Sequence, residues 1–90
     1  KKIVNNYILG VHNTQDETLT FDIKLNDDNF KIKRFEKFSL EAGKRAKKVL
    51  IIESVNDLNN IKTKNIPIFI EVYSQEKNYK VVKKLIFSKP

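Results

Sequence analysis

Apolar and polar residues alternate over much of this chain, most clearly in its first third. Within residues 6–13, and again within residues 18–25, apolar side chains recur at every second position. A period of two is typical of a strand with one buried face. The polar residues 14–17 between the runs predict a hairpin loop. The two strands are therefore expected to pair, with their apolar sides on one face that a second layer must cover.

Further short strands are predicted along the rest of the chain. They cover residues 30–35, 38–40, 44–53, 66–73 and 79–87, after a lead-in or short edge strand at residues 1–4. The strongest turn is expected at residues 26–29, because Asn and Asp tolerate left-handed backbone and bond their own main chain. Gly43 is expected to hold a positive φ at another turn.

Three segments depart from simple alternation. Gly10 lies in mid-strand and predicts a bulge or a close backbone approach. Residues 49–52 are apolar without alternation, which predicts burial on both sides or a register change at a bulge. Residues 54–65 carry apolar side chains at a spacing of three, which is compatible with a single helical turn capping the end of the fold.

A series of short strands with frequent turns predicts an all-β fold. We expect an immunoglobulin-like β-sandwich of about seven antiparallel strands, forming one domain over residues 1–90. The first, second and fifth strands are assigned to one sheet, and the third, fourth, sixth and seventh to the other. A small barrel is the alternative, but only two glycines and no repeating motif favour the open sandwich.

The amino-acid composition limits the kinds of site that this chain can form. Hydrophobic residues make up 40% and charged residues 32% of the chain, as in an ordinary globular domain. The absence of cysteine excludes disulfides, iron–sulfur ligation and thiol chemistry within this chain. There is no methionine, even at the first position, so we expect either a processed protein or a domain cut out of a longer protein, and we favour the second. No run of eighteen apolar residues is present.

The net charge of +7 raises the question of an anionic partner. Arginine, the usual reader of bases and phosphates, occurs only at Arg34 and Arg45, and the lysines are spread along the whole chain. A solvated basic surface is the favoured interpretation. Attraction to an anionic membrane or partner comes next, and nucleic-acid binding last.

The titratable side chains form no recognisable metal site. His12 is the only histidine, and one histidine does not hold a metal by itself. Asp22, Asp27 and Asp28 lack the alternating donors, central glycine and terminal glutamate of a calcium loop, so they are assigned to turns. No metal or cofactor is expected in this domain.

Catalytic residues are not expected either. Ser39 and Ser74 have no histidine or glycine elbow near them in the sequence, which argues against a hydrolase. The domain is therefore predicted not to be an enzyme.

Aromatic residues supply one functional hypothesis. Phe35, Phe69 and Tyr73 are predicted to share the outer face of the second sheet, with Tyr79 as an additional candidate. A contiguous apolar patch there would be a docking surface. The alternative is that long lysine side chains cover these rings with their aliphatic stems.

Several short motifs follow one another in a fixed order. They are Asn6-Tyr7-x-Leu9-x-Val11-x-Asn13, Thr20-Phe21-x-Ile23, Leu40-x-Ala42-Gly43, Pro67-Ile68-x-Ile70-x-Val72 and Ile86-Phe87-x-x-Pro90. In this order they resemble the C-terminal immunoglobulin-like domain of the FixG/CcoG family, over nearly the whole chain. The members of that family are membrane-bound iron–sulfur accessory proteins linked to assembly of cbb-type cytochrome c oxidase.

The resemblance implies a parent protein with transmembrane helices and 4Fe-4S clusters upstream of this domain, in a family associated with copper reduction. The domain itself would be a non-catalytic, extramembrane tail on the periplasmic side of the inner membrane. Its implied partners are its own membrane module or oxidase-assembly proteins, and not nucleic acid. The alternative is a generic adhesion or chaperone-type module that adds a strand to a partner.

Overall fold

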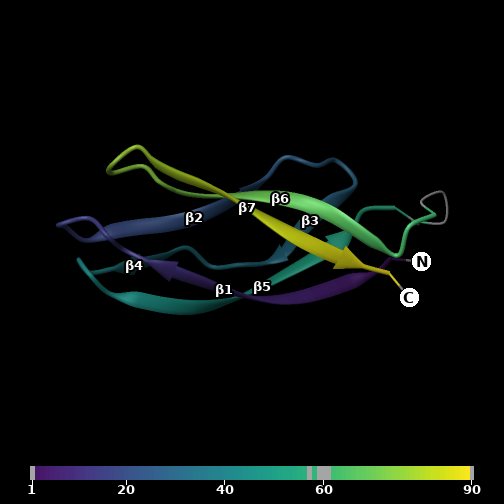
Figure 1. The fold of residues 1–90 in the computed structure, drawn as a ribbon, viewed down its shortest axis with the longest axis horizontal. Helices are drawn as coiled ribbons and strands as arrows, with labels where there is room; N and C mark the ends of the chain where they lie inside the picture. The colour runs from purple at the N-terminus through teal and green to yellow at the C-terminus, as the bar shows by residue number, and fades with distance from the viewer. Residues whose placement is uncertain (1, 57, 59–61, 90) are drawn as a thin grey trace.

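The computed structural model describes residues 2–56, 58 and 62–89, and every regular element among them is a β-strand. Two antiparallel sheets pack face to face, with both ends of the chain at the same end of the sandwich (Figure 1). The predicted all-β sandwich is confirmed. The strands are β1 (Val4–His12), β2 (Leu19–Leu25), β3 (Phe30–Arg34), β4 (Phe38–Leu40), β5 (Arg45–Ser54), β6 (Asn65–Ser74) and β7 (Tyr79–Ser88).

The sheet assignment made from the sequence is wrong for two strands. One sheet has the order β1-β5-β3 and the other the order β4-β2-β6-β7, so β2 and β3 have exchanged places. The segment between β1 and β2 is consequently an arch from one sheet to the other, and not a hairpin. Alternation shows which side of a strand is apolar, but it fits two strands that face each other across a core as well as two paired neighbours.

Of the two irregularities expected within strands, the one at Gly10 is absent and the one at residues 49–52 is present in the strand pairing. The β1–β5 register runs without a shift through Gly10, so no bulge is present there. In β5, Leu50 and Ile52 are buried while Val49 is 48% exposed, so this strand is not buried on both sides. The second alternative, a register change at a bulge, is confirmed opposite Ile51 and Ile52, where the extra residue belongs to the partner strand β3 between Ile32 and Arg34.

The turns follow the sequence more closely. Gly43 has a φ of 77°, as predicted for a turn residue. The Asp27 carboxylate accepts a hydrogen bond from the backbone N–H of Asn29 at 3.0 Å, in the turn expected at residues 26–29. Of residues 54–65, where a helical turn was expected, 57 and 59–61 lie outside the described residues, and the others include no helix. Leu58 is described and is buried.

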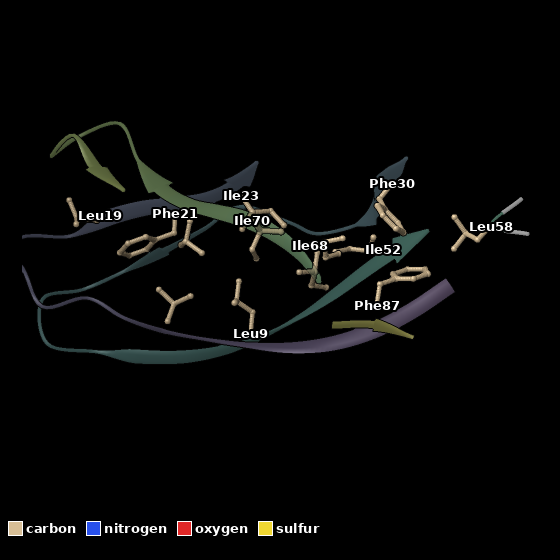
Figure 2. Packing of buried hydrophobic residues seen from close by; sticks show 13 residues of the cluster. Leu9, Leu19, Phe21, Ile23, Phe30, Ile52, Leu58, Ile68, Ile70 and Phe87 are labelled. Carbon is tan, nitrogen blue, oxygen red and sulfur yellow. The ribbon is translucent and has the colours of Figure 1, made fainter. Parts of the chain in front are cut away.

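The core is a single layer of aliphatic and aromatic side chains between the sheets (Figure 2). At the end that holds the chain termini, the Phe30 and Phe87 rings pack with their centroids 4.7 Å apart. At the other end, Phe21 contacts Tyr79 edge-on, with centroids 5.7 Å apart. The buried hydrophobic residues are Leu9, Val11, Leu19, Phe21, Ile23, Phe30, Leu50, Ile52, Leu58, Ile68, Ile70, Val72 and Phe87.

Candidate docking faces

The structure does not bring the four predicted docking aromatics onto one face. Phe69 is 56% exposed on the outer face of β6, and Tyr73 lies half-buried on the same side of that strand. Phe35 and Tyr79 instead pack against the core. Phe35 follows the β3 bulge, which shifts the alternation and turns the side chain inward. Tyr79 is opposite the buried Ser74 and shares its inward orientation.

Aliphatic neighbours that the sequence reasoning missed surround Phe69. In the β6–β7 register, Pro67 is opposite Ile86 and Glu71 is opposite Val82, so both β7 side chains are diagonal neighbours of Phe69. Val82 is 57% and Ile86 44% exposed. We call this group, Pro67, Phe69, Val82 and Ile86, the Phe69 face. The signal was present in the last strand, where outward apolar residues alternate with outward lysines.

The outer surface of the β1-β5-β3 sheet carries aliphatic side chains beside basic ones. Ile8 of β1 is directly opposite Val49 of β5, and these side chains are 66% and 48% exposed. Ile51 continues the apolar strip along β5. Basic residues border it on β3 and on the first half of β5. We call Ile8, Val49 and Ile51, with the bordering Lys31, Lys33, Arg34, Arg45 and Lys47, the Ile8 face.

Glu53 is the carboxylate of β5 that lies beside this basic border. Its two oxygens pair with Lys31 at 3.3 Å and with Lys33 at 3.7 Å. Partial desolvation favours the neutral acid, but the hydrogen bond from Lys31 and the charges of Lys33, Lys31 and Lys2 outweigh it, so the pKa of Glu53 lies below its usual value. Glu53 is therefore ionised at neutral pH and offsets part of the border's charge.

The edge of β7 beside β1 is partly covered by side chains. The Asn5 amide donates to the Ser88 carbonyl and accepts from the Ser88 N–H, both at 3.0 Å, as a paired strand would do. The Tyr7 hydroxyl donates to the Ile86 carbonyl at 2.9 Å. Partial burial raises the pKa of this Tyr7 phenol. The last residues of β7 are thus closed to a further strand.

The remaining edges carry other protective features. Lys83 of β7 donates to the Gly10 carbonyl of β1 at 2.8 Å. A Cβ at Gly10 would meet no atom within 4 Å, so the close backbone approach predicted for this glycine is not present. At the opposite side of the sandwich, β3 contains a bulge and β4 spans three residues. Lysines on an edge, bulges and very short strands are common defences against edge-to-edge pairing.

The polar residues considered as site candidates from the sequence include His12, Ser39 and Ser74, and the structure shows which groups lie next to each. His12 is half-buried at the end of β1, opposite Arg45. The Ser74 hydroxyl donates to Glu76 at 2.7 Å, and the Ser39 and Thr20 hydroxyls lie 3.0 Å apart. In the described part of the chain, no group of three or more His, Cys, Asp or Glu side chains is placed to hold a metal ion. The same residues include no helix long and apolar enough to cross a membrane.

Over residues 1–90 the chain matches the family described as "IG-like fold at C-terminal of FixG, putative oxidoreductase". The chain belongs to this family. The resemblance found in the sequence motifs is thereby confirmed.

A solved structure supports the fold of this FixG C-terminal domain. The crystal structure of a FixG-related protein from Vibrio parahaemolyticus matches it with a TM-score of 0.80 and 12% sequence identity. The match covers 98% of this chain and 80% of that chain. At that identity the likeness shows the fold alone. No curated protein matches the chain.

Two of the motifs that carried the resemblance meet in space. The buried Asn13 side chain donates to the carbonyls of Glu17 and Leu40, each at 2.8 Å, and accepts from the N–H of Gln15 at 2.9 Å. Its backbone carbonyl accepts from the N–H of Gly43 at 2.8 Å. The end of the first motif therefore fixes both the arch from β1 to β2 and the turn that contains Gly43.

Proposed function

We propose that this FixG C-terminal domain is a non-catalytic docking module whose Phe69 face binds a protein partner. The partner would be the membrane module of the parent protein or an oxidase-assembly protein. The parent would carry 4Fe-4S clusters upstream and act in maturation of cbb-type cytochrome c oxidase, with this domain on the periplasmic side of the inner membrane. Family membership supports the parent's redox role, and the exposed Phe69 carries the docking proposal.

The chemistry of the Phe69 face fits a protein more closely than a small molecule. An aromatic ring that is 56% exposed is flanked by two aliphatic side chains on a sheet surface. Aromatic residues are enriched at protein interfaces, where a few of them carry most of the binding free energy. The adjacent charges are mixed, since Lys80 and Glu71 form an ion pair at 3.8 Å and Lys84 is directly opposite Phe69.

Strand addition to an exposed edge is the less favoured mode of binding. The Asn5 and Tyr7 contacts cover the end of β7, and Lys83 reaches across to β1. A partner strand would have to displace these contacts before it could pair. Docking on the Phe69 face requires no such rearrangement.

The test replaces Phe69 in the complete gene product. Phe69→Ser is expected to weaken partner binding at least tenfold, as for a central interface residue, and to lower cbb-type oxidase activity in isolated membranes. Val4→Ser is the matched control, because Val4 is 43% exposed on the other sheet. Immunoblots must show equal amounts of both variants.

A crosslinking experiment identifies the partner directly. A photoreactive phenylalanine at position 69 should give a discrete crosslink to the membrane module or to an assembly protein, and the same probe at position 4 should not. Full oxidase activity of Phe69→Ser, together with no crosslink from position 69, would refute the docking proposal.

A further inference from the structure

We propose that the Ile8 face binds the surface of an anionic phospholipid bilayer. This face lies on the sheet opposite the Phe69 face, so the inference is independent of the proposed protein docking. It rests on an exposed aliphatic strip, a basic border beside it, and a basic hollow at the end of the strip.

The aliphatic strip is set by the β1–β5 register. Ile8 and Val49 are directly opposite each other, and Ile51 is the next outward residue of β5. Ile8, at 66%, is the most exposed large hydrophobic residue in the described part of the chain. These short branched side chains stand on a sheet surface, where they can enter the headgroup region of a bilayer without a change in backbone conformation.

The basic border owes part of its density to the β3 bulge. Ile32 is opposite Ile52 and Arg34 is opposite Ile51, so the β3 chain has one extra residue, Lys33, at that point. Lys33 reaches Glu53 and Arg34 is opposite the outward Ile51, so consecutive cations share the outer face. In a regular strand they would point to opposite faces.

The hollow supplies a place for an anionic headgroup. β3 ends at Arg34, and beyond it a recess is lined by Arg34, Lys37, Lys47 and Lys48 with Glu36, Phe38 and Val49. Cations therefore outnumber carboxylates four to one around it. Lys48 also lies over the Phe38 ring, with its Nζ 4.8 Å from the ring centroid. Val49 joins this hollow to the aliphatic strip, so one ligand surface can contact both.

The residue types favour a lipid surface over an acidic protein. The strip is aliphatic, and lysine supplies most of the cations around it. Protein interfaces are depleted in lysine. Lysines beside exposed aliphatic side chains are typical of proteins that bind anionic lipids, because the long stems keep the charges at the level of the phosphates.

The experiment measures cosedimentation of the 90-residue chain with vesicles. Vesicles of phosphatidylcholine and phosphatidylglycerol at seven to three are compared with pure phosphatidylcholine at physiological salt. The double variant Arg34→Gln/Lys47→Gln should weaken binding to the anionic vesicles about 25-fold, because the loss of each contacting cation weakens binding about fivefold and the two factors multiply. Ile8→Ser should also weaken it, through loss of apolar contact.

The control removes the same net charge from the other sheet. Lys80→Gln/Lys84→Gln should weaken vesicle binding less than threefold if the Ile8 face is the site, which is below the loss of about fivefold for one contacting cation. Equal losses from the two double variants would overturn the proposal in favour of attraction by net charge alone. So would equal binding to the two kinds of vesicle, or binding to a polyglutamate peptide or duplex DNA that is tighter than to the anionic vesicles. Thermal unfolding of each variant confirms that the fold is retained.

Discussion

At the scale of single residues, Asn13 shows how one buried polar side chain holds an irregular segment in place. It is 1% exposed, and its amide uses both donor hydrogens and its oxygen in hydrogen bonds to backbone groups. No other uncharged side chain of that size offers two donors and an acceptor on one planar group, glutamine being longer. The arch between the sheets depends on this geometry.

Replacing Asn13 by aspartate should destabilise the domain severely. Asn13→Asp places a carboxylate oxygen against the carbonyls of Glu17 and Leu40, where two donated hydrogen bonds were. We expect a loss of about 3 kcal/mol in the free energy of unfolding, because a buried group is left facing acceptors. Urea denaturation monitored by circular dichroism measures it. Asn6→Asp, an exposed change on the same strand, should stay within about 0.5 kcal/mol of the parent, and similar losses at both positions would contradict the argument.

The sequence could not reveal that role for Asn13. It marked the residue only as the end of a strand and part of a motif, because its partners at Leu40 and Gly43 are distant in the chain. The sequence was limited in the same way in predicting the orientation of the docking aromatics. Phe69 lies outward as its position in the strand predicts, whereas Phe35 turns inward because a bulge, which leaves no fixed signature in a lysine-rich strand, precedes it.

At the scale of strands, the pattern of apolar residues and turns predicted each strand of the described residues, within a few residues at each end. The pairing of those strands was not determined in the same way. Two strands with the same period fit either as neighbours or across the core, and the arch at residues 13–18 decides between these arrangements. That choice depends on contacts of the loop, of which Asn13 provides the largest number.

The capped end of β7 gives a prediction about exchange of backbone hydrogens. The Asn5 side chain takes the place of a neighbouring strand for Ser88. Asn5→Ala should expose the Ser88 amide and speed its hydrogen exchange about fivefold, as expected from the loss of about 1 kcal/mol of protection. Exchange measured by NMR tests this. The Phe87 amide, in a strand position that pairs with β6, should keep its protection, and unchanged exchange at Ser88 would show that Asn5 does not cap the edge.

At the scale of the whole molecule, the two sheets present different chemistry to their surroundings. One outer surface carries an aromatic and aliphatic group with charges of both signs beside it, and the other carries an aliphatic strip with a basic border. The net charge of +7 does not by itself predict that the two faces differ in charge, because the lysines are scattered along the sequence. The separation arises when strands distant in the chain become neighbours and one bulge aligns consecutive cations.

The same excess of cations makes the fold sensitive to acid. The pKa of Glu76 is lowered by hydrogen bonds from the Ser74 hydroxyl and the Thr20 N–H, and Glu53 has a lowered pKa beside its lysines. Both carboxylates bind protons more weakly in the folded state than in the unfolded chain, so stability rises with pH. Their contribution is complete above their ordinary pKa of 4.5 and is lost as the pH falls through the lower folded values. Protonation of the other carboxylates adds repulsion among the 18 basic residues.

The variant Glu76→Gln separates the contribution of the hydrogen bonds to the Glu76 carboxylate from the general repulsion among the basic residues. The variant cannot supply a charged acceptor to Ser74 and Thr20, so it should be less stable than the parent at neutral pH. This difference should shrink as the pH falls below 4.5, and it should be lost once the pH has passed through the lowered pKa of Glu76, where the parent carboxyl is protonated as well. Urea unfolding from pH 3 to pH 7 measures it. Glu41→Gln changes the net charge equally without touching these hydrogen bonds and should run parallel to the parent. A constant difference between Glu76→Gln and the parent at every pH would mean that the ionised carboxylate of Glu76 does not contribute to the fold.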